Sequence, residues 1–210
     1  FVMEKEGVDF PSAIHMLASR CGVVIPERQY SSPEERQSAA RQRSMREKVY
    51  EINKLFADWF MMHLRSNPNS PVTQYFMTRN IPPEVADAFM IGAAPDSWDA
   101  ALNYGKSKGF TEDDLLTAGI VTSNEQGRVY DRFRNRLVFT IADEQGRPVA
   151  FSARTIEKES QGAKYVNSPE TPVFTKSNVL YGLFQGRQAI HEKGFEILCE
   201  GQIDTIAMHQ

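Results

Sequence analysis

The stretch Glu200-Gly201-Gln202-Ile203-Asp204 contains residue types whose spacing suits chemistry on phosphate groups. Gly201 permits a sharp turn, so the carboxylates of Glu200 and Asp204 can face one volume. Mg²⁺ prefers oxygen ligands and keeps several waters, so one or two carboxylates together with substrate phosphates suffice to hold it. Alternatively, Glu200 acts as an acid or base on a phosphoryl oxygen. A simpler interpretation is that Asp204 caps a helix and Glu200 is solvated.

A second stretch, residues 164–171, reads KYVNSPET. Lys164 offers a mobile point charge for a phosphate, and Tyr165 offers a face on which a base can stack. Asn167 offers paired donors and acceptors for a base edge or a sugar. The competing interpretation is a proline-rich turn in which Asn167 and Ser168 bond their own backbone.

The surrounding segment, residues 128–181, concentrates positive charge. It carries nine Lys and Arg against six Asp and Glu, a balance of +3 in a chain whose formal balance is −3. Aromatic residues are interleaved with these bases, which suits a polyanion whose bases can stack. Arg134 and Arg136 alternate, so on a strand they would project to one face; the alternative is a charged edge that prevents strand pairing. Lys176 suits either this basic surface or an ordinary exposed position.

The cysteines and histidines argue against several other kinds of site. Cys21 and Cys199 stand far apart and neither belongs to a CxxC pair, so we expect no disulfide framework and no complete zinc site. The four histidines show no metal-ligand spacing with the cysteines. No apolar run approaches the roughly 20 residues that a membrane span needs. We therefore expect a globular protein of a reducing cytoplasm, without membrane contact.

The elements that must position these residues begin with helices. Residues 10–22 predict a short helix, opened by Pro11 and Ser12 and closed by Gly22. Residues 26–43 are poor in apolar side chains and predict a solvated linker that can become helical near its end. Residues 44–64 predict a long helix with an apolar side formed by Val49, Ile52, Phe56, Trp59, Phe60 and Met62.

Residues 71–122 continue the helical pattern. Pro82 stands in the favoured first-turn position of one helix. Asp96 or Ser97 is the expected N-cap of the next helix, and Thr111 is the expected N-cap of the last.

The pattern changes to strands at Arg136. Residues 136–143 and 147–154 are β-rich runs with Gly146 in the tight turn between them, and residues 163–167 predict a third, short strand. A helix ending at Gly194 follows. Residues 195–199 then read as a buried strand, with Cys199 as a small apolar residue, before the acidic turn and a helix from about residue 203. The expected fold class is α+β, passing into the first strand, turn and helix of an α/β layer.

With these residues laid out, the chain resembles the bacterial replicative primases of the DnaG type over nearly its whole length. The segments that carry the resemblance are QYFMTRNIPPEVADAFMIGAAPDSWDAAL, RFRNRLVFTIAD, GRPVAFSAR, AKYVNSPETPVFTKSNVLYGL and ILCEGQIDTIAMHQ. The combination of KYxNSPET, LYGL and EGxxD is far more specific than the EGxxD turn alone.

The resemblance implies roles for particular residues. The acidic turn would open a Toprim subdomain in which Glu200 is catalytic, Glu200 and Asp204 bind Mg²⁺ or Mn²⁺, and Gly201 makes the turn. The family's further metal-binding aspartates would lie beyond Gln210. The basic part would grip template DNA and incoming nucleotides, through Arg79, Arg132, Arg134, Arg136, Arg154, Lys164, Tyr165, Asn167 and Lys176.

The resemblance also implies a division of the chain. Residues 1–25 would end a zinc-ribbon domain whose Zn²⁺ ligands lie outside this chain, and residues 26–43 would be a linker. Residues 44–194 would form the N-terminal basic subdomain of the catalytic core, helical over 44–122 and β-rich over 123–194. Residues 195–210 would begin the truncated Toprim subdomain. Because the chain has no initiating Met and stops within an apparent helix, we expect both ends to be cut. Because the family's further metal-binding aspartates would lie beyond Gln210, we expect this piece alone to be inactive.

The function that the resemblance implies is DNA-dependent RNA synthesis. Such an enzyme makes RNA primers on single-stranded DNA from ribonucleoside triphosphates, at the replisome in the bacterial nucleoid. Its contact with the replicative helicase would use a C-terminal domain missing from this chain.

Two other hypotheses remain open. The chain is a nucleic-acid-binding module if two carboxylates alone do not hold the metals. A different Toprim enzyme, a nuclease or topoisomerase, would share the acidic turn but is not expected to carry KYVNSPET. The sequence departs from the family's pattern at Ser152 and Ala153, where glycines are usual, and at Gln202, where an aromatic or apolar residue is common. We expect altered turn geometry there rather than a changed reaction.

Overall fold

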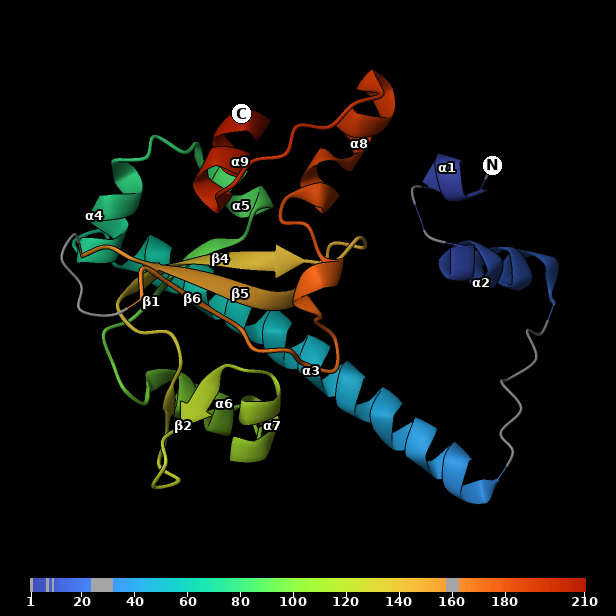
Figure 1. Ribbon diagram of the computed structural model, residues 1–210, viewed down its shortest axis with the longest axis horizontal. Coiled ribbons are helices and arrows are strands. Elements are labelled where there is room, and N and C mark those ends of the chain that lie inside the picture. Colours follow the sequence, from blue (N-terminus) through green and yellow to red (C-terminus); the bar gives the residue numbers. More distant parts are fainter. Residues whose placement is uncertain (1, 7, 9, 24–31, 158–162) are drawn as a thin grey trace. The chain divides into compact units, whose positions relative to one another are not determined.

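The computed structural model describes residues 2–6, 8, 10–23, 32–157 and 163–210 (Figure 1). The chain divides into two compact units, Phe1–Ser44 and Met45–Gln210. Both units contribute to helix α3 (Pro33–Ser66), which crosses the division. No described helix combines the length and the apolar composition that crossing a bilayer requires.

The first unit is helical, as predicted. It contains α1 (Val2–Glu6) and α2 (Phe10–Cys21), which are joined by an ion pair between Arg20 and Glu6 at 3.4 Å. Gly22 adopts a φ of +66° directly after α2, the left-handed conformation that suits the end of a helix. The expected role of Gly22 as the helix terminator is therefore confirmed.

The structure describes only the second part of the predicted linker, from residue 32 onward. Residues 26–31 lie outside the described residues. Residues 33–43 are helical and belong to α3, which agrees with the expected helix near the end of the linker. The Oγ of Ser32 accepts a hydrogen bond from the N–H of Glu35, which caps the helix. Alanine, glutamine, glutamate and arginine follow, and their high helix propensity outweighs the lack of apolar residues.

The second unit is built on a four-stranded antiparallel sheet in the order β1-β4-β5-β6. The strands are β1 (Ile91–Ala94), β4 (Arg136–Ala142), β5 (Pro148–Thr155) and β6 (Tyr165–Asn167). The predicted hairpin and third strand are confirmed, and Gly146 in the hairpin turn has a φ of +81°. The mixed helix and sheet class that the sequence predicts is therefore correct.

Helix α3 covers one face of this sheet (Figure 1). Phe56 and Phe60 pack on Val138, Phe151 and Ala153, whose side chains share that face. The predicted apolar side of the helix is buried except at Met62, which is 49% exposed, while Leu64 is buried instead. Because β4 and β5 are central strands, their other face must be covered as well.

Three short helices and the residues around them cover the opposite face. These are α4 (Pro71–Met77), α5 (Pro83–Ala88) and α9 (Gln202–His209). Leu137 and Phe139 of β4 pack there with Phe89 and Ile206. Figure 1 shows α5 and α9 together on the side of the sheet away from α3.

A smaller layer adjoins the sheet through helices α6 (Ala100–Ser107) and α7 (Glu112–Thr117) and the two-stranded ribbon β2 (Val121–Ser123) and β3 (Val129–Asp131). Thr111 caps α7 in a capping box with Asp114, as predicted. Asp99 is the N-cap residue of α6, although the Oγ of Ser97 accepts the N–H of Ala100. The prediction that Asp96 or Ser97 is the N-cap residue of α6 is therefore wrong.

Strand β1 lies inside the range 44–122 that was predicted to be helical, and β2 crosses the end of that range. β1 is buried along its whole length, so its sequence IGAA lacks the alternation that marks a half-buried strand. β2 is only three residues long and depends on pairing with β3, a contact that local periodicity does not reveal.

The C-terminal part contains the 3₁₀ turn η1 (Lys176–Asn178) and α8 (Leu183–Lys193), which ends at Gly194 with a φ of +73°, as predicted. Residues 195–199 are not a strand, and Phe195, Ile197 and Leu198 are exposed. Cys199 is half-exposed rather than buried. A strand needs a partner for its backbone hydrogen bonds, and no described strand pairs with this segment.

Strand β1 approaches helix α3 closely at Gly92. A Cβ added there would lie 2.4 Å from the Cβ of Phe60 and 2.5 Å from its carbonyl carbon. We expect Gly92→Ala to lower the free energy of unfolding by about 1–3 kcal/mol, because α3 and β1 must separate. Urea unfolding followed by circular dichroism measures this. The control is Gly186→Ala in α8, where the nearest atom would be 3.6 Å away; an equal loss in both variants would contradict the close-contact explanation.

Candidate nucleic-acid interface and acidic turn

Four alternating arginine and tyrosine side chains connect α4 to the edge of the sheet. The guanidinium of Arg79 lies 4.5 Å from the ring centre of Tyr75 and donates a hydrogen bond to its hydroxyl. Arg154 in β5 lies 5.8 Å from the same ring and 5.7 Å from the ring of Tyr165, to whose hydroxyl it donates at 3.2 Å. These contacts hold two arginines beside two aromatic faces, an arrangement that can bind phosphates and stack bases.

The strand register explains why Arg154 and Tyr165 meet. Arg154 is paired with Tyr165 across β5 and β6, so both side chains project to the same face. The carbonyl of Lys164 accepts hydrogen bonds from the N–H of Thr155 at 2.9 Å and from Arg136 at 3.3 Å. The side chain of Lys164 is exposed beside this group, and the exposed Asn167 lies two residues further along β6. The structure therefore brings five of the predicted binding residues together with Arg79.

Arg134 forms a second cluster with two aromatic rings. Its guanidinium lies 4.0 Å from the ring centre of Trp98 and 5.3 Å from that of Tyr130. The Trp98 ring is itself 60% exposed. The expectation that Arg134 and Arg136 alternate on one strand is wrong, because β4 begins at Arg136 and Asn135 adopts a φ of +48°. The turn separates the two side chains and sends Arg134 to the aromatic pair.

Asp131 anchors the loop that carries Trp98. Its carboxylate accepts hydrogen bonds from the N–H groups of Ala101 at 2.7 Å and Leu102 at 3.0 Å, at the start of α6. Its own N–H donates to the carbonyl of Trp98, and its carbonyl accepts from Arg134. Burial raises the pKa of Asp131, although the two N–H donors favour the ionised form.

The remaining predicted binding residues lie elsewhere. Arg132 is half-buried and its Nε donates to the carbonyl of Gly119 at 3.0 Å, and burial lowers the pKa of its guanidinium. Burial also lowers the pKa of Arg136, followed by the nearby charge of Arg134. Lys176 is exposed, and its backbone N–H donates to the carboxylate of Glu170. Its neighbour Phe174 packs on the start of β5, the end opposite to Arg154, so Lys176 is not part of the arginine and tyrosine cluster.

The competing interpretation of the SPET loop is wrong for Ser168. Its Oγ accepts the N–H of Phe151 and its N–H donates to the carbonyl of Phe151, so it bonds β5 rather than its own backbone. Pro169 packs against Gly119, where an added Cβ would lie 2.5 Å from its Cδ. The loop is therefore tied to the same elements that hold Arg132.

The acidic turn directly precedes α9. Glu200 and Asp204 are exposed, and the Thr205 N–H donates to the carbonyl of Gly201 at 3.0 Å. Gln202, the first residue of α9, donates from Nε2 to the Oγ of Ser152 at 3.1 Å. Two of the three positions where the sequence departs from the family's pattern, Ser152 and Gln202, thus contact each other, and the turn rests on the strand that carries Arg154.

The acidic turn presents two carboxylates, those of Glu200 and Asp204, to a divalent metal ion. A Cβ on Gly201 would lie 2.9 Å from Oδ2 of Asp204, so the missing side chain leaves room for that carboxylate. Among the described residues, no three His, Cys, Asp or Glu side chains form a set that could hold a metal. Two carboxylates fit an open Mg²⁺ site that waters and substrate phosphates complete.

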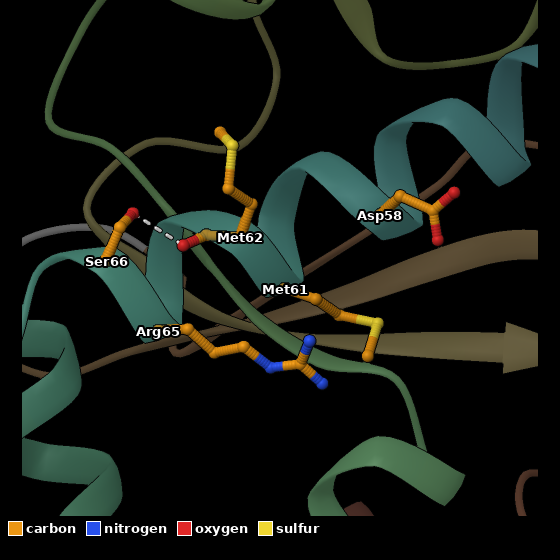
Figure 2. A pocket seen from close by; sticks show the side chains of 5 residues that line it. All are labelled: Asp58, Met61, Met62, Arg65 and Ser66. Carbon is orange, nitrogen blue, oxygen red and sulfur yellow. Dashed lines mark hydrogen bonds between the residues drawn. The ribbon is translucent and has the colours of Figure 1, made fainter.

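One surface cavity adjoins the acidic turn, and a smaller one lies on α3. The larger, about 510 Å³, lies between α8, residues 195–201 and α9, beside Glu200. The smaller, about 380 Å³, lies on α3, and Figure 2 shows its lining of Asp58, Met61, Met62, Arg65 and Ser66. Arg65 is paired with Asp87, and the Ser66 hydroxyl donates to the Met62 carbonyl. This second cavity has no convergent set of free polar groups.

Comparison with known proteins decides the family. Residues 59–187 match the family described as the DNA primase catalytic core, N-terminal domain. The chain belongs to this family. The DNA primase of Deinococcus radiodurans is 37% identical over 211 residues, which cover 100% of this chain and 34% of that protein. This chain therefore spans about a third of the length of the curated relatives it matches.

Solved primase structures share the fold. One is the RNA polymerase domain of the Mycobacterium tuberculosis primase DnaG, in complex with a double-stranded DNA oligomer with a 6-nucleotide overhang. It is 32% identical, has a TM-score of 0.71, and is matched over 78% of this chain and 51% of that chain. Another contains the zinc binding and RNA polymerase domains of the Aquifex aeolicus primase. It is 30% identical, has a TM-score of 0.68, and is matched over 100% of this chain and 48% of that chain.

Sequence reasoning missed three aromatic residues of the interface, Tyr75, Trp98 and Tyr130. The signal that was available for Tyr75 is its spacing four residues before Arg79 on a helical segment, which places both on one face. Trp98 and Tyr130 are far apart in sequence, so only the folded chain shows that they share Arg134.

The Asp131 anchor yields a stability prediction. We expect Asp131→Ala to lower the free energy of unfolding by about 2–4 kcal/mol, because two backbone N–H groups at the start of α6 lose their acceptor. Urea unfolding followed by circular dichroism measures the change. Asp96→Ala, at an exposed position in the same loop, is the control; similar small losses in both variants would rule out the anchoring role.

Proposed function

We propose that this chain is part of the catalytic core of a DNA-dependent RNA polymerase that makes RNA primers on single-stranded DNA. One observation carries the proposal beyond family membership. The arginine and tyrosine cluster and the acidic turn are held on the same face of β5, through Arg154 and through the bond from Gln202 to Ser152. A surface for nucleic acid thus lies beside carboxylates suited to phosphate chemistry.

The template would bind through charge and stacking together. Arg79, Arg154 and Lys164 are placed to contact phosphates, which are sequence-independent contacts. Tyr75, Tyr165 and Trp98 offer ring faces to unpaired bases. The Mycobacterium tuberculosis relative was solved with DNA that has a single-stranded overhang, which supports DNA as the ligand class.

The acidic turn would serve nucleotide addition. In that reaction the primer 3′-hydroxyl attacks the α-phosphate of a ribonucleoside triphosphate and pyrophosphate leaves. Glu200 and Asp204 would hold Mg²⁺ or Mn²⁺, which supplies charge stabilisation when bound. Gly201 leaves room for the Asp204 carboxylate, and the exposed Glu200 can also accept a proton at its carboxylate. Arg79 and Arg154 would orient the phosphates.

The finer assignments belong to the same proposal. Residues 1–25 would end a zinc-binding domain. The match of 100% of this chain to 48% of the Aquifex aeolicus chain, which contains zinc binding and RNA polymerase domains, supports this. Residues 44–194 would be the basic subdomain and residues 195–210 would begin the Toprim subdomain. The RNA primer, the replicative helicase and a place in the bacterial cytoplasm at the replisome would follow from this function.

Primer synthesis on single-stranded DNA with Mg²⁺ and ribonucleotides tests the function directly. In a full-length primase that carries this segment, we expect wild-type synthesis and a loss of at least a hundredfold in Glu200→Ala, with DNA affinity unchanged. Glu192→Ala, at an exposed position in α8, should retain synthesis. DNA binding without any synthesis in the wild type would instead favour a binding module, the alternative that follows if the two carboxylates of the acidic turn do not hold the metals.

Salt dependence tests the phosphate contacts separately. Arg154→Ala and Lys164→Ala should each weaken binding to single-stranded DNA and reduce the slope of log affinity against log salt by about 0.7, because each removes one phosphate contact. Lys108→Ala removes an equal charge outside this cluster and should leave the slope unchanged. Fluorescence anisotropy at several salt concentrations gives the slopes, and equal slopes in all four proteins would refute the assignment.

A further inference from the structure

We propose that Gln202 and Ser152 together act as a positioning pair that sets the location of the Glu200 carboxylate relative to Arg154. This inference rests on the proposed function and extends it to two residues that do not contact the reacting groups. The pair is linked by the hydrogen bond from Nε2 of Gln202 to Oγ of Ser152, at 3.1 Å.

Ser152 is a fixed point in the sheet. It is fully buried and lies in the middle of β5, where it is paired with Phe139 on one side and Asn167 on the other. Its side chain is on the face opposite to Phe151 and Ala153, which pack against α3. A buried hydroxyl without a partner would cost about 1–3 kcal/mol, so the bond to Gln202 is favoured over leaving the group unpaired.

Gln202 is the first residue of α9, at the end of the helix that directly follows the acidic turn. The N-cap residue Gly201 contributes no side-chain hydrogen bond to the helix. One turn further on, Ile206 is fully buried under Phe89, and the Thr205 methyl would be only 2.7 Å from a Cβ on Gly182. Apolar contacts therefore hold the middle of α9, and Gln202 holds its beginning.

The segment before the turn offers little support of this kind. Residues 195–198 are exposed and form no strand in the described part of the chain. Within the described part of the chain, the contacts that fix the turn therefore come from α9, through Gln202 and Ile206. Breaking the Gln202 bond would let the turn shift while Ile206 keeps the helix docked.

The pair also connects the two halves of the proposed site. Ser152 and Arg154 are two residues apart on the same face of β5, about 7 Å along the strand. The bond thus fixes the acidic turn to the strand that presents Arg154. A displacement of about 1 Å between reacting groups is enough to slow a reaction substantially, so this geometry bears on rate rather than on affinity.

Paired variants of a full-length primase that carries this segment test the proposal. Ser152→Thr keeps the hydroxyl. Ser152→Val has nearly the same shape as Ser152→Thr but lacks the hydroxyl. We expect kcat for primer synthesis to be on the order of tenfold lower in Ser152→Val than in Ser152→Thr. The KM for nucleotides and the DNA affinity should be unchanged. Gln202→Met should lower kcat equally, and Gln188→Met in α8, an exposed position, should have no effect.

A double variant and hydrogen exchange separate positioning from general loss of structure. Gln202→Met added to Ser152→Val should cause no further loss, because one bond has already gone. Amides of residues 201–206 should exchange faster in Gln202→Met while those of β4 remain protected. Additive losses in kcat, or unchanged exchange in α9, would overturn the pairing.

The outcomes also distinguish the inference from the proposed function. Wild-type synthesis with unaffected variants would overturn positioning alone. Faster exchange with unchanged kcat would show a stabilising bond without a role in catalysis, and would also overturn it. A wild type that makes no primers would remove the proposed function, and the positioning role with it.

Discussion

The need to bury both faces of β5 governs the second unit of this protein. Antiparallel sheets can leave one face to solvent. Here β4 and β5 have a strand on each side, and residues of helices pack on both of their faces. The face toward α3 is largely apolar, with Phe151 and Ala153 against Phe56 and Phe60. The opposite face is mixed, because Leu137 and Phe139 give way to Ser152 and Arg154 toward β6. The candidate site lies where this second face changes from apolar to polar.

That change gives the interface its particular chemistry. Arginines beside aromatic rings keep their charge while part of the side chain lies on an apolar surface. Arg154 and Arg79 do so around Tyr75, and Arg134 does so at Trp98. Each guanidinium is held before any ligand arrives, which reduces the conformational entropy that binding would cost.

The sequence was sufficient for the long amphipathic helix, the β4–β5 hairpin and the helix ends at Gly22 and Gly194, because each depends on local periodicity or on a glycine with positive φ. It was insufficient for β1 and β2, whose strand character comes from pairing with distant segments. It was wrong for residues 195–199, where an apolar run has no described strand to pair with.

The candidate site shows the same division. Arg154 and Tyr165 follow from strand alternation once the hairpin is recognised, and Lys164 and Asn167 follow from their motif. Arg134 was chosen for the wrong reason, since the turn at Asn135 removes it from the strand. The buried partner of Arg132 and the contact of Gln202 with Ser152 depend on tertiary packing alone, so no spacing rule could have found them.

The two tryptophans of the chain stand in opposite environments. Trp59 is 6% exposed among the aromatic rings of α3, and Trp98 is 60% exposed beneath Arg134. An aqueous quencher such as iodide would therefore reach one indole and spare the other. The chain carries two intrinsic fluorophores, of which one reports on the interior of the protein and the other on the surface where a nucleic acid would lie.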